Sequence, residues 1–376
     1  MIPFNRPYLI GRELEYIAAA HNKGQLAGDG FYTKQCNAWL ETNTGCHKAL
    51  LTHSCTAALE MAAILADIQP GDEIIMPSYT FVSTANAFVL RGGIPVFVDI
   101  RSDTLNINEQ LIENAITPRT KAIVPVHYAG VACEMEQIMA IARKYNLLVI
   151  EDAAQGIKAT YKGRALGSIG DFGCYSFHET KNIIAGEGGA LLINNPKYAD
   201  RAEIIREKGT NRSQFFRGDV DKYTWVDKGS SYLPGEIVAA FLYAQLEESD
   251  KITSERLKLW NLYHELIRPI CESMSVFRQP FDNVCEHNAH IYYLLFGDSD
   301  MRDMFISAMR RHGIYCVFHY VPLHSSPFGH QHCRVYGDLA VTNKVSSSIV
   351  RMPLYIGLEP MEVVQAIDRC LQELAA

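Results

Sequence analysis

The feature that most constrains the fold is an alternation of short apolar runs with helical patterns from residue 48 to residue 153. The apolar runs, which predict strands, cover residues 48–52, 71–77, 94–100, 121–128 and 147–153. The patterns between them predict helices over residues 56–65, 83–92, 108–116 and 134–145. The runs are continuous, which is typical of strands covered on both faces. This alternation predicts an α/β fold, a mostly parallel sheet with helices on both sides.

The pattern changes after residue 153. Two further apolar runs, residues 172–177 and 189–194, flank a glycine-rich stretch and predict a hairpin. A charged helix is expected over residues 196–208, whereas residues 209–232 are polar and aromatic without a clear period. Long irregular segments inside compact domains are more often functional than passive.

The last third of the chain predicts a second, smaller unit. Residues 233–270 have a helical pattern, and we place a domain boundary inside this stretch. The prediction is a large domain over residues 1–250 and a small α+β domain over residues 251–376. In the small domain we expect strands over residues 290–296 and 314–318, a helix over residues 301–312, and a last helix from residue 360.

Charge and cysteine usage narrow the class of function. The net charge of −7 opposes binding to nucleic acid, which needs clustered Lys and Arg, but it permits a locally positive anion site. The N-terminus has no signal-peptide pattern and no apolar run has membrane-spanning length, so we expect a cytoplasmic protein with no membrane partner. The ten cysteines form no CxxC pair, so we expect neither a metal site nor a disulfide framework.

Lys181 stands in SFHETKNIIAGEGG, between an apolar strand and a glycine turn. A lysine at such a place is usually a solvated charge. Its neighbours point to chemistry instead, because Ser176, His178 and Thr180 are polar and the glycines permit close backbone approach. A lysine that attacks a carbonyl group needs such a shielded position, where its surroundings lower its pKa.

Asp152 ends the apolar run of VIEDAAQ, in the region where parallel sheets bind ligands. A helix cap would be the ordinary explanation of an isolated aspartate. Gln155, however, follows three residues later on the same side of the strand end. A carboxylate at this place could keep a pyridinium nitrogen protonated, which makes the ring an electron sink.

Two further segments suit a flat, phosphorylated ligand. In LLTHSCTAAL a strand runs into Ser54, Cys55 and Thr56, which form either an ordinary helix N-cap or a phosphate site with free backbone N–H groups. In PSYTFVSTANA, Phe81 is either a core residue or an aromatic that stacks on a ring. Each signal is weak alone. Together they supply a phosphate cradle, a ring face, a pyridinium partner and a nucleophilic lysine.

The chain resembles the DegT/DnrJ/EryC1/StrS family of sugar aminotransferases in the segments PSYTFVSTANA, PVHYAGVA, VIEDAAQ, SFHETKN and GEGG. The resemblance covers nearly the whole chain and implies an aspartate-aminotransferase-like fold with seven strands in the large domain. It also implies bound pyridoxal 5'-phosphate and a homodimer with active sites at the subunit interface. By this resemblance Lys181 is the cofactor-linked lysine and Asp152 contacts the pyridinium nitrogen. The other implied cofactor contacts are Gln155 near the ring hydroxyl, Phe81 on the ring face, and Cys55, Thr56 and Ser176 at the phosphate.

One segment departs from the family pattern. Many members carry an asparagine that reaches the phosphate bound by the neighbouring subunit, and here GSSYLP places Ser231 at that position. A serine can still donate one hydrogen bond. The diphosphate of a sugar nucleotide needs positive partners, and the candidates, which would also suit a solvated basic loop, are Lys208, Arg212, Arg217 and Lys222. The candidates for contact with the sugar are His178, His319, Tyr320 and His324.

The segment REKGTNRSQFFRGDVDKYTWVDKGSSYL resembles members that act on dTDP-4-keto-6-deoxy-D-glucose. The implied reaction moves an amino group from L-glutamate to C4 of this sugar, which gives dTDP-4-amino-4,6-dideoxy-D-galactose and 2-oxoglutarate. The product would serve surface polysaccharide, in particular enterobacterial common antigen. Amination at C3 of a related keto sugar is an open alternative. A sugar dehydratase of this family carries histidine at the lysine position, and a catalytically silent sensor would not need both Lys181 and Asp152.

Overall fold

The computed structural model describes residues 1–274, 277–278 and 285–375. The α-helices are α1 Glu13–Asn22, α2 Phe31–Thr44, α3 Cys55–Leu65, α4 Val82–Val89, α5 Glu109–Ala115, α6 Met135–Tyr145, α7 Ala199–Arg206, α8 Arg212–Arg217, α9 Glu236–Glu247, α10 Ser249–Met274, α11 Ser299–Arg311, α12 Pro327–His332, α13 Ala340–Ser348 and α14 Pro360–Ala375. The strands are β1 Lys48–Thr52, β2 Glu73–Pro77, β3 Ile94–Val98, β4 Thr120–Ile123, β5 Leu148–Asp152, β6 Thr160–Tyr161, β7 Arg164–Ala165, β8 Phe172–Ser176, β9 Gly189–Ile193, β10 Phe277–Arg278, β11 Tyr293–Phe296, β12 Arg334–Val335 and β13 Ile349–Arg351.

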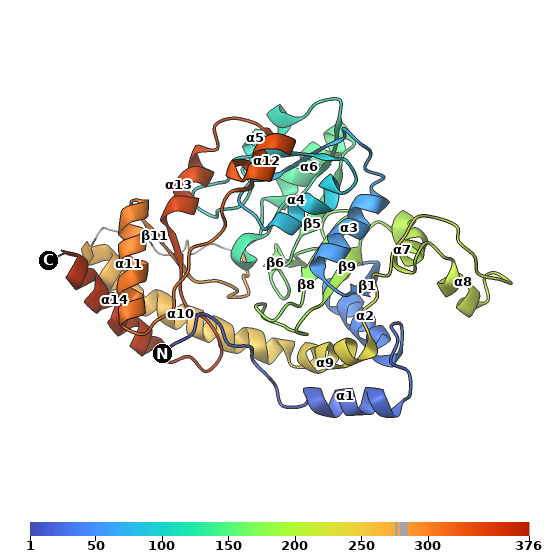
Figure 1. The fold of residues 1–376 in the computed structure, drawn as a ribbon, viewed down its shortest axis with the longest axis horizontal. Coiled ribbons are helices and arrows are strands. Elements are labelled where there is room, and N and C mark those ends of the chain that lie inside the picture. Colours follow the sequence, from blue (N-terminus) through green and yellow to red (C-terminus); the bar gives the residue numbers. More distant parts are fainter. Residues whose placement is uncertain (275–276, 279–284, 376) are drawn as a thin grey trace.

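An eight-stranded sheet forms the centre of the molecule, in the order β1-β9-β8-β5-β4-β2-β3-β12 (Figure 1). All neighbouring pairs are parallel except those of β9, which runs antiparallel to both β1 and β8. The predicted α/β fold with a mostly parallel sheet is therefore confirmed. Seven strands come from residues 48–193, and the eighth, β12, arrives from the C-terminal part of the chain and pairs with β3.

Successive residues of the central strands pack into cores on opposite faces of the sheet. Ala190 and Leu192 join the core that contains residues of α2, α5, α6 and α9. Leu191 and Ile193 join the core that contains residues of α3, α4 and α7. Burial on both faces explains why these strands appear in the sequence as continuous apolar runs.

The predicted hairpin of residues 172–177 and 189–194 is confirmed as a pair, because β8 and β9 are antiparallel neighbours. Its connection is a twelve-residue loop, residues 177–188, which carries Lys181. Helix α7 lies within residues 196–208, where the charged helix was predicted, and follows a short 3-10 turn at residues 196–198. The irregular segment that follows contains one short helix, α8.

The C-terminal part of the chain builds a second core around β11 and β13, together with α10, α11 and α14. The predicted strand over residues 314–318 is wrong, because Ile314 and Val317 form only isolated bridges with Ile2 and Arg351. The N-terminal residues thus cross to this part of the molecule, where the backbone N–H of Ile2 donates to the carbonyl of Gly313 at 2.8 Å (Figure 1). The boundary near residue 250 falls where α10 begins, and the two-domain division stays a prediction.

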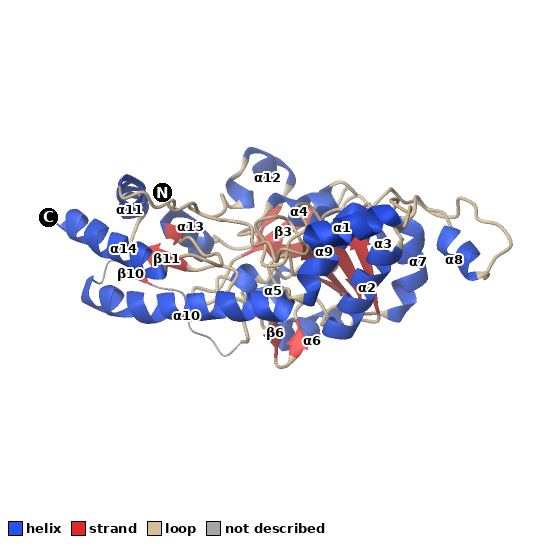
Figure 2. Ribbon diagram, turned by 90° about the horizontal axis from the view of Figure 1, so that it is seen from below, coloured by secondary structure: helices blue, strands red, loops and turns tan. Residues whose placement is uncertain are grey.

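Figure 2 shows that residues 207–231, which include α8 and are called the arm below, project from one end of the molecule. Helix α14 lies at the opposite end in both views. Among the residues that the structure describes, no helix is long and apolar enough to span a membrane.

Candidate active site

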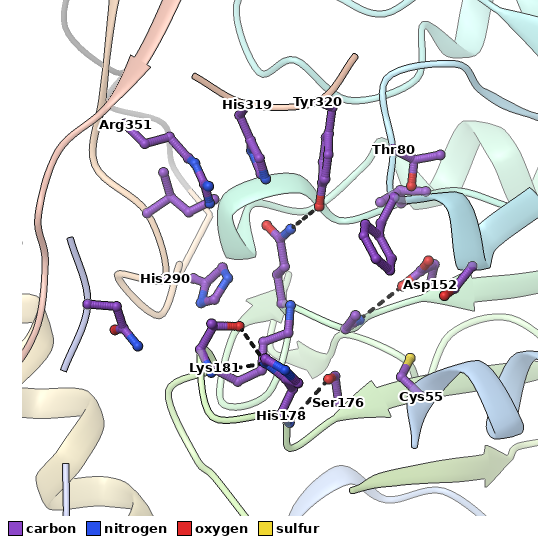
Figure 3. A pocket seen from close by; sticks show the side chains of 18 of the residues that line it. Cys55, Thr80, Asp152, Ser176, His178, Lys181, His290, His319, Tyr320 and Arg351 are labelled. Atoms are coloured by element: carbon purple, nitrogen blue, oxygen red, sulfur yellow. Dashed lines mark hydrogen bonds between the residues drawn. The ribbon is translucent and has the colours of Figure 1, made fainter. Parts of the chain in front are cut away.

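A pocket of about 860 Å³ opens between the carboxyl ends of β5 and β8 and the C-terminal part of the chain (Figure 3). It is lined by most of the residues that the sequence singled out, namely Ser54, Cys55, Thr56, Phe81, Asp152, Gln155, Ser176, His178, Lys181, His319 and Tyr320. These residues lie as much as 266 positions apart in the chain (54 to 320) and still meet in one cavity.

Lys181 reaches the pocket from the loop that connects β8 and β9. The backbone N–H of Lys181 donates to the carbonyl of His178 at 2.9 Å, which closes a turn just before the lysine. Burial lowers the pKa of the Lys181 amine below its ordinary value, and the positive charge of Arg351 acts in the same direction, while Asp152 opposes both. A lysine with a lowered pKa is more often the neutral, nucleophilic amine.

Asp152 ends β5 and is held by two hydrogen bonds. Its Oδ2 accepts from the Thr84 hydroxyl at 2.6 Å, and its Oδ1 accepts from the backbone N–H of Ala154 at 3.2 Å. Thr84 in turn lies 2.8 Å from the hydroxyl of Thr80, so α4 fixes the direction of the carboxylate. A buried carboxylate fixed in this way can hold a proton on a cationic ring nitrogen opposite it.

Ser54, Cys55 and Thr56 form the N-terminus of α3, with Ser54 as the residue that caps the helix. The Ser54 Oγ caps the helix by accepting from the backbone N–H of Ala57 at 3.1 Å. Gly189 permits close approach of β9 to this loop, because a Cβ at this glycine would lie 2.3 Å from the carbonyl carbon of Ser54 and 2.4 Å from the backbone nitrogen of Cys55. Ser176 ends β8, opposite Gly189 of the neighbouring strand β9, and also lines the pocket. Hydroxyls and a helix N-terminus together suit a phosphate group.

Phe81 is 57% exposed and lines the pocket, so the alternative that it is a core residue is wrong. Its ring centroid lies 6.5 Å from that of Tyr320, which has a left-handed backbone with φ of 41°. This conformation is unusual for a bulky residue and must be held by neighbours. The Tyr320 hydroxyl accepts from Gln155 Nε2 at 3.1 Å, and Gln155 Oε1 accepts from the backbone N–H of Ala129 at 2.6 Å.

His319 stacks on Tyr320 with ring centroids 3.6 Å apart, and its Nδ1 lies 2.7 Å from the Tyr128 hydroxyl. Burial lowers the pKa of His319 well below its ordinary value, so the ring is neutral near pH 7. His178 is at the rim, 2.9 Å from the Thr180 hydroxyl and 3.6 Å from the Glu187 carboxylate.

The remaining predicted residues lie outside this pocket. His324 does not line the cavity, because its ring forms hydrogen bonds with Ser78, just after β2, at 2.7 Å and with Asn343 of α13 at 3.1 Å. The other residues outside the pocket belong to the arm and are Lys208, Arg212, Arg217, Lys222 and Ser231. Arg212 and Arg217 already pair with acidic residues of α7 or its end, Glu207 at 3.5 Å and Glu203 at 2.7 Å.

Three cationic or basic residues of the pocket, His290, Arg256 and Arg351, were not predicted from the sequence. Arg351 interrupts the apolar run SIVRMPLY, and this interruption is the sequence feature that could have identified Arg351 as a residue of the pocket. Arg256 is surrounded by polar helix residues, so its sequence environment gave no signal. Its guanidinium donates to the carbonyls of Ala289 and His290 at 3.0–3.1 Å, which fixes the loop that carries His290.

The pocket fits pyridoxal phosphate by its own geometry and charge. It joins a buried carboxylate, a lysine with a lowered pKa, and a hydroxyl-rich helix N-terminus that Gly189 allows β9 to approach. In the described part of the chain, no group of three or more His, Cys, Asp or Glu residues could hold a metal ion.

The model of the DegT/DnrJ/EryC1/StrS aminotransferase family matches residues 7–370. The chain is 31% identical to the spore coat polysaccharide biosynthesis protein SpsC of Bacillus subtilis, over 98% of this chain and 95% of the relative. It is also 31% identical to the GDP-perosamine synthase of Caulobacter vibrioides, over 97% of each protein. Among solved structures, an aminotransferase from Psychrobacter cryohalolentis superposes with a TM-score of 0.92 at 26% identity, over 100% of both chains.

Proposed function

The chain belongs to the DegT/DnrJ/EryC1/StrS aminotransferase family, and on this premise we propose that it transfers the amino group of L-glutamate to C4 of dTDP-4-keto-6-deoxy-D-glucose. Membership makes the protein a pyridoxal-phosphate-dependent nucleotide-sugar aminotransferase. The product would be dTDP-4-amino-4,6-dideoxy-D-galactose for surface polysaccharide, including enterobacterial common antigen. The name of one relative, the spore coat polysaccharide biosynthesis protein SpsC, supports the polysaccharide setting. The name of another, GDP-perosamine synthase, supports a nucleotide-linked product.

The observation that carries the proposed amino transfer is the meeting of Lys181, Asp152 and the Ser54–Thr56 loop in one pocket, while the choice of acceptor rests on the resemblance of residues 206–233. When bound there, pyridoxal phosphate draws electrons away from the carbon that exchanges its amino group. Asp152 would hold the proton of the ring nitrogen, and Phe81 and Gln155 would orient the ring. Lys181 would anchor the cofactor and then, as a free amine, carry a proton at its Nζ to and from the reacting carbon.

The reaction is proposed in two halves. In the first half the amino group leaves L-glutamate, and one water molecule supplies the keto oxygen of the departing 2-oxoglutarate. In the second half the amino group is transferred to the keto carbon of the sugar, whose oxygen leaves as water. Because the two substrates use one pocket in turn, the kinetics should be ping-pong.

The deciding experiment is incubation of the holoenzyme with L-glutamate and a panel of keto-sugar nucleotides, followed by NMR of the product. We expect the product to carry its new amino group at C4 of the dTDP-linked sugar, where the proton couplings also reveal its orientation. A product aminated at C3 would favour the alternative acceptor, a dTDP-3-keto-6-deoxyhexose. Lys181→Ala should give a colourless protein without turnover, and colourless wild-type protein that takes up no cofactor would contradict the whole proposal.

We also propose a homodimer with each site at the subunit interface. The arm projects from the body and exposes large aromatic side chains, since Phe216 is 70% exposed and Trp225 is 78% exposed (Figure 2). Apolar surface of this kind is usually covered by a partner. Docking of the arm on a second subunit would carry Ser231 and the basic residues Lys208, Arg212, Arg217 and Lys222 to the other pocket, near the phosphates that they are proposed to contact.

A further inference from the structure

We propose that Asn106, which lies in the loop between β3 and α5, is a positioning residue of the active site. Asn106 holds the turn of residues 127–133, and this turn points the backbone N–H of Ala129 at Gln155. The contact fixes which end of the Gln155 amide faces the pocket. The inference rests on the proposed function above, because it concerns the contact of Gln155 with the cofactor ring.

The turn has a strained backbone where it meets Gln155. Ala129 is left-handed, with φ of 60° and ψ of 15°, a conformation in which the Cβ of an alanine is crowded. The backbone N–H of Ala129 donates to Gln155 Oε1 at 2.6 Å. The preceding residue, Tyr128, places its hydroxyl 2.7 Å from Nδ1 of His319. One strained turn thus contacts two residues that line the pocket, and its neighbours must hold it in this conformation.

Asn106 holds the turn through its backbone groups. Its Oδ1 accepts from the backbone N–H of Tyr128 at 2.9 Å, and its Nδ2 donates to the carbonyls of Val131 and Ala132 at 3.0 Å each. These three hydrogen bonds hold the chain on both sides of the strained residue. Asn106 itself is 1% exposed and does not line the pocket. It therefore acts on the pocket through the turn.

The main chain of Gln155 is fixed separately, by Asn288. The Nδ2 of Asn288 donates to the carbonyls of Gln155 and Ile157 at 2.7 Å each. The turn also approaches Asn288 closely at Gly130, where a Cβ would lie 1.9 Å from Asn288 Oδ1. With its main chain held, Gln155 could still turn its amide end over. The backbone N–H of Ala129 removes that freedom, because it binds Oε1 alone.

The direction of the amide decides what Gln155 offers to the cofactor ring. A side-chain amide has one acceptor oxygen and two N–H donors. The oxygen is bound by the N–H of Ala129, a donor that cannot reverse, so Nε2 is directed at Tyr320. One N–H of Nε2 donates to the Tyr320 hydroxyl at 3.1 Å (Figure 3), and the other is left for the ring oxygen of the cofactor. A reversed amide would place its oxygen against that ring oxygen, and two acceptors repel each other.

His127 closes the other end of the turn. Its Nδ1 accepts from the backbone N–H of Cys133 at 3.1 Å, so Nε2 carries the ring proton and donates to Glu151 at 2.9 Å. Both side chains of the His127–Glu151 pair are fully buried. Replacing His127 would leave a buried carboxylate without this donor and endanger the fold. The three hydrogen bonds of the Asn106 side chain all go to backbone groups, so a variant at Asn106 is the better test.

The test measures the pH midpoint at which the visible absorbance of the holoprotein changes, as the linkage between the cofactor and Lys181 loses its proton. A hydrogen-bond donor at the ring oxygen competes with that proton, so loss of the donor should raise the midpoint. We expect Asn106→Ala to raise the midpoint by about one pH unit or more. Gln155→Leu, which removes the donor itself, should raise it by at least as much.

The matched control is Asn194→Ala. Asn194 follows β9, away from the pocket lining, and its Nδ2 donates to the carbonyls of Gly167 and Gly170 at 2.9 Å each. We expect this variant to lose stability to urea as Asn106→Ala does, but to keep the absorbance midpoint within about 0.2 pH units of the wild type. Equal absorbance shifts in the two variants would mean a general loss of packing and would overturn the inference.

A second substitution tests the strain at Ala129. Glycine adopts a left-handed backbone without crowding, so Asn106→Ala combined with Ala129→Gly should recover at least about half of the shift. An undiminished shift in the double variant would overturn the role given to the turn. If circular dichroism shows that Asn106→Ala is unfolded, Asn106→Ser takes its place, with a smaller shift in the same direction expected and no shift counting against the inference.

Gln155→Leu separates this inference from the proposed function. A raised midpoint in Gln155→Leu beside an unchanged midpoint in Asn106→Ala would overturn the inference and leave the ring contact of Gln155 standing. An unchanged midpoint in Gln155→Leu would contradict that ring contact, which belongs to the proposed function, and the inference with it.

Discussion

At the scale of the residue, the lowered pKa of Lys181 has a measurable consequence for stability. Burial lowers the folded-state pKa from its ordinary value of 10.5, so the folded protein binds a proton at Lys181 less readily than the unfolded chain does. The contribution of Lys181 to the free energy of unfolding is therefore most favourable above pH 10.5. It falls as the pH decreases from that value through the folded-state pKa.

We predict that cofactor-free Lys181→Met gains stability relative to cofactor-free wild type as the pH falls below 10.5. The methionine fills a similar volume but does not titrate, so the other ionisable groups cancel in the difference. Urea denaturation of both proteins at several pH values measures this difference. A difference that shrinks on acidification would mean that Asp152 stabilises a charged Lys181.

The hydroxyl of Thr84 sets the direction of the Asp152 carboxylate, as their 2.6 Å hydrogen bond indicates. We predict that Thr84→Val lowers kcat about tenfold, because loss of a hydrogen bond to a charged group costs about 1.5 kcal/mol.

Asp152→Ala should lower kcat by about a hundredfold or more with the fold retained, because it removes the ring-nitrogen contact itself. Steady-state kinetics measures kcat for Thr84→Val and Asp152→Ala, and circular dichroism checks that each variant is folded. Normal turnover of Asp152→Ala would show that this carboxylate does not serve the ring nitrogen.

At the scale of the element, the sequence predicted helices and strands best where burial of apolar side chains is the dominant interaction. The apolar runs of the central strands and the helices between them were predicted because burial on both faces leaves few polar residues in a strand. The strand over residues 314–318 was predicted wrongly, since Ile314 and Val317 use their backbone groups in single bridges to distant segments. Two-residue strands such as β12 carry too little pattern to be found, because their pairing depends on tertiary contacts.

Strand β9 and the N-terminus of α3 are a single packing unit, and Gly189 is where they touch. We predict that Gly189→Ala weakens binding of pyridoxal phosphate by at least about tenfold, because the new Cβ would meet backbone atoms of Ser54 and Cys55 at 2.3–2.4 Å. Those atoms belong to the proposed phosphate cradle, so the loop must shift. Titration of the apoenzyme with cofactor, followed by absorbance, measures the effect.

The control for this change is Gly297→Ala. A Cβ at Gly297 has no neighbour within 4 Å, and this glycine lies in the C-terminal part of the chain. The Gly297→Ala variant should bind the cofactor with the affinity of the wild type. Equal cofactor affinity of Gly189→Ala and the wild type would show that the loop yields without loss of the phosphate site.

At the scale of the whole molecule, the sequence predicted residues near the central sheet better than those brought from elsewhere. Asp152 ends one strand of a regular sheet and Lys181 follows another, so their common edge could be inferred from topology. Arg256, His290 and Arg351 reach the same pocket from α10, the loop before β11 and β13. Their positions depend on how the C-terminal part packs on the sheet, and a local pattern does not contain that information.

The exposed aromatics of the arm predict an association surface. We expect Phe216→Asp, at a residue that is 70% exposed, to shift the protein from dimer toward monomer at micromolar concentration. The change in the stability of an isolated subunit should stay within about 0.5 kcal/mol, because the ring is exposed there. Sedimentation velocity measures the shift. The control is Met361→Asp on α14, at the other end of the molecule, and a dimer unaffected by Phe216→Asp would place the interface elsewhere.

If each site combines Lys181 of one subunit with the arm of the other, two inactive variants should restore one another. Lys181→Ala removes the nucleophile, and Ser231→Asp places a negative charge where the arm is proposed to meet the phosphate of the second subunit. In a hybrid dimer one site takes Lys181 from the Ser231→Asp subunit and an intact arm from the Lys181→Ala subunit. Random mixing makes about half of the dimers hybrid, each with one intact site of two, so activity should recover to about a quarter of the wild-type value.

The assay for this complementation is turnover after joint denaturation and refolding of the two variants, compared with each variant refolded alone. If Ser231 instead served the pocket of its own subunit, every site in a hybrid dimer would carry one of the two substitutions. The mixture would then stay as inactive as its components, and the sharing of sites between subunits would be wrong. Recovery to about a quarter can arise only when Lys181 and Ser231 of one site come from different chains, because neither variant carries both wild-type residues.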